Sequence, residues 1–331
     1  MTLRSTALDP VRQMVQVAGR YRSPRRWRVQ ARVNRRMTVP PLPRARRVPG
    51  SIWAVGIVRD EVDVVLATLD QLFAQGIDRI LVADNGSVDG TRELLLERAA
   101  EDPRLFVARD SEPAHHQSEK VTFLAHHAWR AGADWIVPFD ADEWFFAAGE
   151  SVAACLRGQP VDVGIVSARM YQMVRVSGPD PIGVDTGFVL DASPVLPGKV
   201  AFRAHPLAEV HSGNHWATRV GRAVTELHLA HALYRSRDQV ARKVRQGAAA
   251  ERLAAGELSV SRGVHWARGA RLGDAELDAV WEAISTGRPE PRLAVEAHGP
   301  MVTVRPLSWT TWDPHHEVPV RPPVWPGAEL R

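Results

Sequence analysis

The chain has 331 residues, of which 45% are hydrophobic and 24% are charged, an ordinary composition for a globular protein. Its single cysteine, Cys155, excludes an internal disulfide and a metal site made only of cysteines. No apolar run reaches the roughly 20 residues that span a bilayer, and the N-terminus lacks the apolar core of a secretory signal, so we expect a cytoplasmic protein.

The formal charge of +4 is unevenly distributed along the chain. Residues 1–50 contain thirteen arginines, no lysine and one acid, a formal charge of +12, which leaves −8 for the rest. Helical spacing is weak over residues 11–37, and four prolines then predict a stiff linker: Pro40, Pro41, Pro43 and Pro49. We therefore predict that residues 1–50 form a basic arm and a Pro-rich linker.

Two readings of this arm stay open. It is either a solvated, disordered segment or, through residues 1–47, a peripheral contact with an anionic membrane. Nucleic acid is the less favoured partner, because only Tyr21 and Trp27 could stack on bases and no DNA-reading motif is present.

From Ser51 the pattern alternates between strands and helices. Continuous apolar runs predict strands buried on both faces at residues 52–58, 79–83, 105–108 and 135–139. Helical spacing predicts helices over residues 61–75, 89–100 and 118–131. This order predicts an α/β fold whose mostly parallel central sheet is flanked by helices and joined by right-handed crossovers.

Beyond Glu150 we predict a smaller region of mixed structure. Apolar runs predict strands at residues 161–171, 199–204 and 225–230, and helical spacing predicts helices over 236–254 and 274–284. Residues 178–198, rich in Pro, Gly and Asp, are predicted to form a long functional loop. The tail from Pro289 onward shows no clear periodicity.

Polar residues follow each strand of the first half, at the edge where ligands bind in parallel sheets. Clustered carboxylates repel one another unless a cation or hydrogen-bond donors lie among them. Asp140 and Asp142 follow a buried strand two residues apart, which suits Mg²⁺ or Mn²⁺, whose shell is commonly completed by substrate phosphate. An ordinary acidic turn is the alternative.

Three segments together resemble family 2-type glycosyltransferases of the GT-A fold, in particular a bacterial branch with a D-A-D-E motif. They are residues 56–61, residues 84–91 (D-N-G-S-V-D-G-T), and residues 132–136 leading into residues 140–143 (D-A-D-E). A fourth segment, residues 231–236 with Gln239 and Lys243, is similar to a later motif of that branch. The resemblance covers about residues 51–250 and implies a GT-A-like, Rossmann-like sheet with a smaller mixed acceptor-side region.

The resemblance implies a metal-dependent enzyme that moves a sugar from a UDP- or GDP-sugar to an acceptor hydroxyl with inversion. The implied acceptor is a glycan or a lipid-linked molecule. We accordingly divide the chain after the arm into a nucleotide-sugar-binding half (51–150), an acceptor and metal-completing half (151–270), and a C-terminal helix and tail (271–331).

The resemblance also implies roles for single residues. Asp140, Asp142 and His231 are expected to hold Mn²⁺ or Mg²⁺, with His215 as the second candidate histidine. The donor nucleotide and its phosphates are expected to contact these residues: Asp60, Glu61, Asp84, Asn85, Lys120, Asp140, Arg235 and Lys243. The structural alternatives are helix capping for the acids, solvated helix faces for Arg235 and Lys243, and a structural histidine.

Inversion by one in-line displacement requires a general base on the acceptor hydroxyl. We expect Glu209 in this role, because it precedes residues 213–215 in a segment that should border the acceptor. Asp185 and Glu226 are further candidates, and a surface acid is the alternative for Glu209. Asp142 is expected to take part in catalysis through the metal.

Two other functions stay open. A sugar-nucleotide nucleotidyltransferase would usually carry a Gly-rich phosphate loop after the first strand, where this chain has Val58, Arg59, Asp60 and Glu61. A non-catalytic module, tethered to a membrane or nucleic acid by the arm, is the second alternative. The presence of Asp140, Asp142 and His231 argues against it.

Overall fold

The computed structural model describes residues 23–43, 47–254, 268–286, 290–293 and 298–314, together with residues 15, 45 and 288. Most of the predicted basic arm before residue 23 therefore lies outside the described residues. The described part of the arm includes the helix α2 (Pro24–Arg36), which begins after the Ser23 cap and leads into the short strand β1 (Met37–Thr38). Among the described helices, none is both long and apolar enough to cross a membrane.

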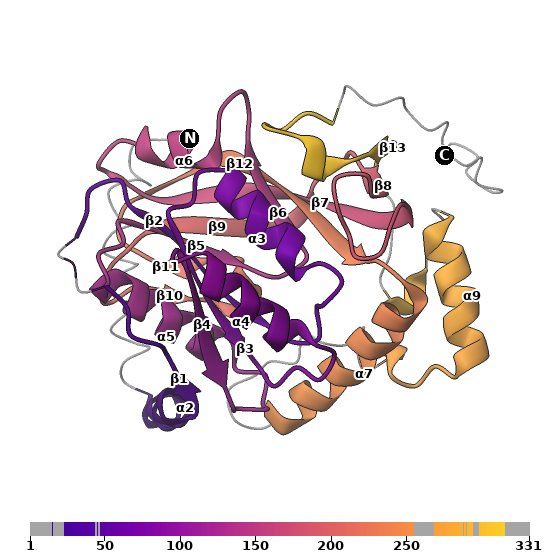
Figure 1. The fold of residues 1–331 in the computed structure, drawn as a ribbon, viewed down its shortest axis with the longest axis horizontal. Coiled ribbons are helices and arrows are strands. Elements are labelled where there is room, and N and C mark those ends of the chain that lie inside the picture. The colour runs from indigo at the N-terminus through magenta and orange to yellow at the C-terminus, as the bar shows by residue number, and fades with distance from the viewer. Residues whose placement is uncertain are drawn as a thin grey trace.

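One large sheet runs through the molecule (Figure 1). Its first part is parallel, in the order β4 (Leu105–Asp110), β3 (Arg79–Asp84), β2 (Ile52–Val58) and β5 (Trp135–Phe139), with β1 antiparallel on β4. The mixed part continues with β9 (Val195–Arg203), β7 (Val163–Ser177), β12 (Arg222–Tyr234) and β6 (Glu143–Ala147). This arrangement confirms the predicted α/β class.

The strand directions decide where the polar ends meet. Strand β9 is antiparallel to both β5 and β7, so β7 runs parallel to β5, and β12 is parallel to β7. The carboxyl ends of β2, β3, β5, β7 and β12 therefore point toward the same edge of the sheet. Strand β6 runs the opposite way beside β12, so its first residue lies at that edge.

Helices cover the parallel part on both faces. The helices α3 (Val65–Ala74) and α4 (Thr91–Glu101) pack on one face, and α5 (Gln117–Arg130) and α2 pack on the other. Strand β2 serves both cores, because Ile52 and Ala54 face the first while Trp53 and Val55 face the second. A strand buried on both faces must be apolar at every position, which is why this run was readable from the sequence.

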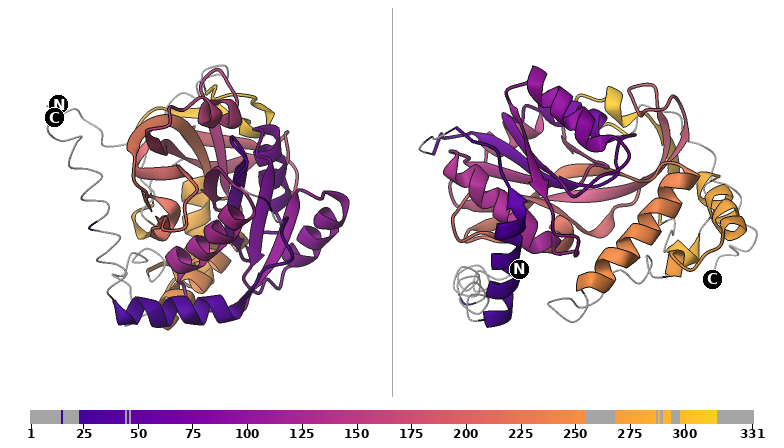
Figure 2. Two further views of the ribbon diagram at one scale, coloured as in Figure 1. Left: turned by 90° about the vertical axis from the view of Figure 1, so that its left-hand side faces the viewer. Right: turned by 60° about the horizontal axis from the view of Figure 1, so that its bottom comes forward.

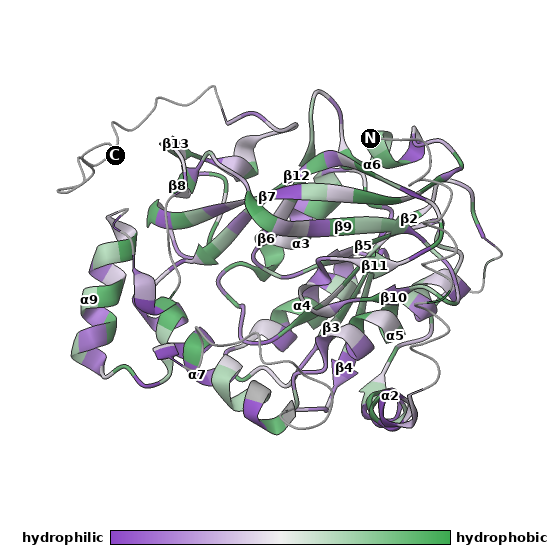
Figure 3. Ribbon diagram, turned by 180° about the vertical axis from the view of Figure 1, so that it is seen from behind, coloured by the Kyte–Doolittle hydropathy of each residue, from purple (hydrophilic) through white to green (hydrophobic). Residues whose placement is uncertain are grey.

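A third, smaller core lies beside the sheet. It joins α7 (Arg237–Ala254) to α9 (Asp274–Ser285) through Val240, Val244, Leu277 and Val280. Figure 2 shows these two helices next to each other, and Figure 3 shows hydrophobic and hydrophilic residues mixed along both. Amphipathic helices of this kind bury one face and leave the other to water, so α7 can carry charged side chains toward the sheet edge.

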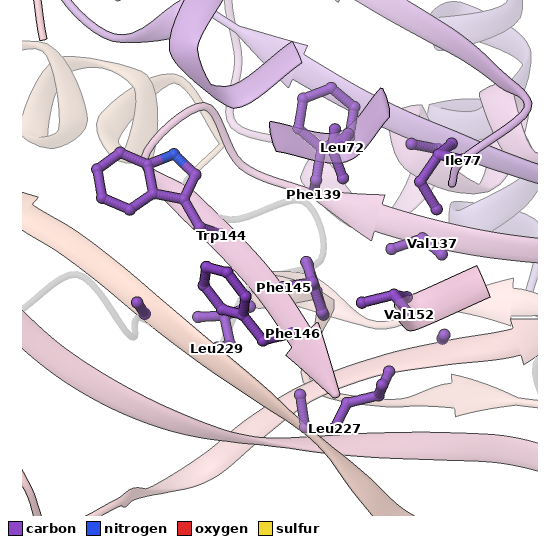
Figure 4. Packing of buried hydrophobic residues seen from close by; sticks show 14 of the residues in the cluster. Leu72, Ile77, Val137, Phe139, Trp144, Phe145, Phe146, Val152, Leu227 and Leu229 are labelled. Atoms are coloured by element: carbon purple, nitrogen blue, oxygen red, sulfur yellow. The ribbon is translucent and has the colours of Figure 1, made fainter. Parts of the chain in front are cut away.

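The sequence prediction missed several short elements. Strand β6 is fully buried, and Figure 4 shows Trp144, Phe145 and Phe146 among the residues of the first core. The helix α6 (Val152–Arg157) follows it. The predicted loop over residues 178–198 is wrong, because it contains β8 (Gly187–Asp191) and the start of β9. The tail likewise contains β13 (Met301–Val304), which pairs with β8.

These errors share a physical reason. Short strands among Pro and Gly residues are stabilised by the strands that flank them, and the local pattern carries little of that information. The same holds for the two-residue strands β10 (Glu209–Val210) and β11 (Ala217–Thr218) and for the single 3₁₀ turns at Ser212–Asn214, Pro291–Leu293 and Pro306–Ser308.

Candidate functional site

Two adjoining cavities open at the carboxyl edge of the sheet. The smaller cavity, about 210 Å³, is bordered by the ends of β2 and β3, the loop before α5, and α7. The larger cavity, about 480 Å³, extends over β5, β6, β7 and β12. Seven residues line both: Ile57, Val58, Arg59, Glu61, His115, Gln117 and Lys243. A single extended ligand can therefore occupy both.

The turn after β3 fixes the turn after β2. Asp60 has a φ of +56°, a conformation that is uncommon outside glycine. The backbone N–H groups of residues 60–62 donate to side chains of the second turn at 2.8 to 3.1 Å, namely Ser87, Asp89 and Thr91. These bonds hold residues 60–62 out of the helix, so α3 begins at Val65 and not at the predicted residue 61.

The residues of the two turns that were predicted to contact the nucleotide do not all lie at the same place in the structure. Asp60 and Asn85 line the smaller cavity. Asp84 lines neither cavity. It is only 1% exposed, and its carboxylate accepts the N–H groups of Gly86 and Ser87 at 3.2 Å. These two hydrogen bonds are those of the structural alternative, a carboxylate that closes its own turn.

Lys120 also lines the smaller cavity, but its charge is already paired. Its Nζ lies 2.7 Å from Asp110 Oδ2 and donates to the carbonyl oxygen of Glu112 at 2.6 Å. Burial lowers the pKa of Lys120, and Asp110 opposes that shift. The same Asp110 carboxylate accepts a hydrogen bond from Asn85 Nδ2 at 2.7 Å, so Lys120 organises the wall of the cavity.

A group of three potential metal ligands lies in the larger cavity: Asp142, Glu143 and His231. One donor atom from each lies within 4.8 Å of the other two. His231 on β12 is paired with Glu143 on β6 in the sheet register, and its Nε2 lies 3.6 Å from Asp142 Oδ2. We call these three residues the metal trio.

Two atoms of the metal trio need a partner. Glu143 Oε2 and His231 Nδ1 are buried, and within the described part of the chain neither has a hydrogen-bond partner. A buried polar group left unpaired costs about 1–3 kcal/mol. The two carboxylates suit Mn²⁺ or Mg²⁺, and the imidazole nitrogen favours Mn²⁺, the softer of the two ions, so the residues present fit such an ion.

The metal trio differs from the predicted ligand set by one residue. Asp140 is not one of the residues whose donor atoms lie within 4.8 Å of one another, and its two oxygens contact Gln117 at 3.0 Å, Asn214 at 3.1 Å and Lys199 at 2.8 Å. Glu143 takes its place. This residue is the last letter of the D-A-D-E motif, so the sequence signal existed, but only the unpredicted strand β6 gives Glu143 its position.

Lys199 is a functional-site residue that the sequence analysis did not identify. It is buried on β9, and its Nζ lies 2.8 Å from Asp140 Oδ2 and 2.6 Å from Glu143 Oε1. Burial alone would lower the pKa of Lys199, but the two carboxylates raise it above its ordinary value. Burial raises the pKa of Glu143 to about 8, although Lys199 acts in the opposite direction.

Arg235 does not reach into either cavity. It is 1% exposed, and its guanidinium pairs with Glu61, with Asp63 at 2.7 Å and with Asp142 at 3.4 Å. Burial raises the pKa of Glu61 to about 7, while Arg235 lowers it. The phosphate contact of Arg235 stays a prediction, and in this structure three carboxylates already pair with its guanidinium.

Lys243 is placed as the sequence analysis expected. It extends from α7, lines both cavities, and its Nζ lies 2.5 Å from Asp142 Oδ2. Burial would raise the pKa of Asp142, but Lys243, His231 and Arg235 hold it well below its ordinary range. A charged Asp142 is therefore available to a cation at neutral pH.

The predicted base Glu209 lies elsewhere. It sits on β10, 3.5 Å from Arg26 Nη1, and lines a separate cavity of about 300 Å³ beside α2 and α5. Glu209 lies on β10, which pairs with β11, and its cavity is lined by residues of α5. Residues 213 and 215, a few positions later in the chain, border the larger cavity instead. Asp185 and Glu226 line neither of the two adjoining cavities.

Comparison with known proteins identifies the first half of the site. Residues 55–176 match the family model described as Glycosyl transferase family 2. The matched segment contains the D-A-D-E motif, and its similarity to a glycosyltransferase family favours sugar transfer over the nucleotidyltransferase alternative. No curated protein matches the chain.

Two solved structures are remotely similar. The mannosyltransferase PcManGT from Pyrobaculum calidifontis, in complex with GDP-Man and Mn²⁺, is 15% identical, with 86% of this chain and 88% of that chain covered and a TM-score of 0.38. TarS 1-349 from S. aureus, in complex with UDP, is 12% identical, with 65% and 69% covered and a TM-score of 0.37. These likenesses are too distant to assign a ligand to this chain.

Proposed function

We propose, on the premise that residues 55–176 form a family 2 glycosyltransferase domain, that the chain moves a sugar from a UDP- or GDP-sugar to an acceptor hydroxyl. The observation that carries the proposal is the pair of adjoining cavities with Lys243 between them and the metal trio in the larger one. The nucleotide would occupy the smaller cavity, the diphosphate its border, and the sugar the larger cavity.

Side chains at the border support this placement of the diphosphate. Lys243 lines both cavities, and its neighbour Arg242 lines the smaller one, so α7 brings two cations to the same place. Asp142, Glu143 and His231 would hold Mn²⁺ or Mg²⁺, which neutralises the charge that develops on a departing diphosphate. Lys199 balances the charges of Asp140 and of Glu143, which belongs to the metal trio.

The transfer itself is a single displacement. The acceptor oxygen forms a bond to the anomeric carbon while the bond from that carbon to the phosphate oxygen breaks, and the electron pair leaves with the nucleoside diphosphate. Attack opposite the leaving group inverts the anomeric centre. The hydroxyl proton passes to a general base.

We assign the role of base to His215 in place of Glu209. His215 lines the larger cavity, and its Nδ1 lies 2.7 Å from the carbonyl oxygen of Gly198. A carbonyl only accepts, so Nδ1 carries the hydrogen and Nε2 is the basic nitrogen of the neutral ring. Glu209, paired with Arg26 in a separate cavity, has no such access.

We further propose a glycan or lipid-linked acceptor and a cytoplasmic protein that contacts an anionic membrane. Figure 2 shows α2 on the outside of the molecule beside α5, and α2 buries Val29 and Val33 against the second core. Arg25, Arg28 and Arg35 are exposed on the same helix. A basic face held rigidly outward is suited to anionic lipid headgroups.

Thermal denaturation with UDP or GDP tests the function. We expect either nucleotide with MnCl₂ to raise the melting temperature of the wild type, because a ligand at 100 times its Kd stabilises by about 2.7 kcal/mol. EDTA and Asp142→Ala should each remove the Mn²⁺-dependent part. The control Asp162→Ala changes an exposed acid paired with Arg222 and should respond like wild type.

Two results would contradict the proposal. If Asp142→Ala responds to Mn²⁺ like wild type, the metal assignment is wrong. If neither nucleotide stabilises the wild type at any concentration of Mn²⁺, the nucleotide-sugar assignment is wrong.

A further inference from the structure

A row of three side chains crosses neighbouring strands at the larger cavity. The sheet register pairs Gln172 on β7 with His231 on β12, and His231 with Glu143 on β6. All three line the larger cavity. Glu143 and His231 belong to the metal trio, and Gln172 has no role in the site as described so far.

Gln172 brings an unpaired acceptor into this cavity. Its Oε1 is buried and, within the described part of the chain, has no hydrogen-bond partner. Leaving such a group unpaired costs about 1–3 kcal/mol, so a ligand that supplies a donor is favoured there. Gln172 is not one of the three residues whose donor atoms lie within 4.8 Å of one another, and it lies two strand spacings, about 10 Å at the backbone, from Glu143.

The position of Gln172 relative to the diphosphate indicates which ligand group it meets. Lys243, Arg59 and Glu61 line both cavities, whereas Gln172 and its strand neighbour Met170 line only the larger one. A sugar attached to a diphosphate at the border must extend past the metal trio into the larger cavity. Gln172 lies one strand spacing, about 4.8 Å, beyond His231, which is within reach of a sugar ring at that place.

We propose that Gln172 is a specificity-determining residue that hydrogen-bonds a hydroxyl of the transferred sugar. A carboxamide offers both an acceptor and donors, and a hydroxyl can donate and accept, so the two groups are complementary. The lining beside Gln172 includes the apolar Met170 and Leu233, which offer a hydroxyl no competing partner through their side chains. The inference rests on the proposed function, because it assumes a sugar nucleotide in the two cavities.

Calorimetry on Gln172→Met tests the inference. The full chain is titrated, with MnCl₂ present, against UDP and GDP and then against UDP-glucose, UDP-galactose, UDP-N-acetylglucosamine and GDP-mannose. For the sugar nucleotides of whichever nucleotide binds, we expect Gln172→Met to raise the Kd by roughly threefold to tenfold, which corresponds to the loss of one neutral hydrogen bond. The affinity for the free nucleoside diphosphate should stay unchanged, so the ratio of the two Kd values changes.

A matched control separates this effect from the loss of any amide. Gln159→Met removes a carboxamide that bonds Glu226 at 2.5 Å, outside both adjoining cavities, and should leave the ratio as in wild type. If circular dichroism shows that Gln172→Met does not fold, Gln172→Asn replaces it. Asn shortens the amide by one methylene and should lower the sugar nucleotide affinity in the same direction.

Three outcomes would overturn the inference. An unchanged ratio in Gln172→Met would mean that the amide does not touch the sugar. A loss of Mn²⁺-dependent affinity for UDP or GDP would show that Gln172 instead positions His231. Failure of the wild type to bind any nucleotide would overturn the proposed function and this inference with it, whereas the first two outcomes leave the proposed function intact.

Discussion

Lys243 Nζ lies 2.5 Å from Asp142 Oδ2, although 101 positions separate the two residues in the sequence. The contact joins α7 to the turn after β5 at the border of the two adjoining cavities. It places a cation beside a carboxylate that we assign to the metal, and it makes α7 part of the site.

The first prediction concerns this lysine. Lys243→Met should weaken the binding of UDP or GDP by roughly 10-fold to 100-fold, because a charge-assisted hydrogen bond contributes about 1.5–3 kcal/mol. Calorimetry with MnCl₂ present measures the change. Arg245→Met, which alters an exposed cation on the same helix that pairs with Asp274, is the control and should bind like wild type. Equal affinity of Lys243→Met and wild type would exclude a phosphate contact.

The second prediction uses two arginines with different burial. Arg235 and Arg237 each pair with three carboxylates, but Arg235 is buried and the Arg237 pairs are exposed. Arg235→Leu should lower the free energy of unfolding by about 3–5 kcal/mol, because it leaves the buried Asp142 and the half-buried Glu61 and Asp63 without this shared partner. Arg237→Leu should denature with urea like wild type. Equal losses in the two variants would mean that burial does not decide the cost.

The third prediction decides between the two candidate bases. His215→Asn keeps a donor at the position of Nδ1 for the Gly198 carbonyl but removes the basic nitrogen, so the transfer rate, or donor hydrolysis with water as acceptor, should fall roughly 10²-fold to 10⁴-fold. Glu209→Gln should stay close to the wild-type rate, because Glu209 lies in a separate cavity. A large loss in Glu209→Gln with a normal His215→Asn would restore the assignment made from the sequence.

The fourth prediction concerns acid stability. His228 stacks on Trp312 with ring centroids 4.8 Å apart, and burial, with a contribution from Arg169, lowers the pKa of His228 to about 4. Its ordinary pKa is near 6.5, so between pH 6.5 and 4 the unfolded chain binds a proton that the folded chain does not. Stability from this residue is present above pH 6.5 and is lost as the pH falls. The melting temperature of His228→Phe should therefore fall less between pH 7 and pH 5 than that of the wild type. Parallel losses would show that His228 titrates normally in the fold.

The fifth prediction tests the membrane contact. A triple change of Arg25, Arg28 and Arg35 to Glu should lower the affinity for phosphatidylglycerol vesicles, measured by cosedimentation, by at least roughly fivefold for each arginine. Binding to vesicles of pure phosphatidylcholine should be weak for the wild type and the variant alike. The charge-matched control changes three exposed arginines elsewhere to Glu: Arg222, Arg245 and Arg288. If the control loses binding as strongly as the α2 variant, overall charge and not α2 is responsible.

The part of the candidate site that could be predicted from the sequence is the part whose position depends on neighbouring residues in the chain. Residues 52–58 and 135–139 are continuous apolar runs, and the structure has strands with these bounds. A buried strand ends where polar residues begin, so the positions of Asp140 and Asp142 at the sheet edge followed directly. Lys243 was found through a motif resemblance.

The residues that were missed depend on pairing between distant strands. Lys199 lies in a strand that looked ordinary, and only the antiparallel placement of β9 beside β5 and β7 brings it to Asp140. Glu143 depends on the register of β6 with β12. The expectation for Glu209 lacked the same information, because nearness to His215 in sequence does not imply nearness to its cavity.

The place of β6 in the sheet has a consequence for synthesis. Among the described strands, β6 pairs only with β12, so Glu143 leaves the ribosome long before the strand that fixes it. A nascent chain that ends before residue 222 also lacks His231, Arg235 and Lys243. The proposed site for a divalent ion is therefore complete only after β12 has been made, and a truncated translation product should bind none at this place.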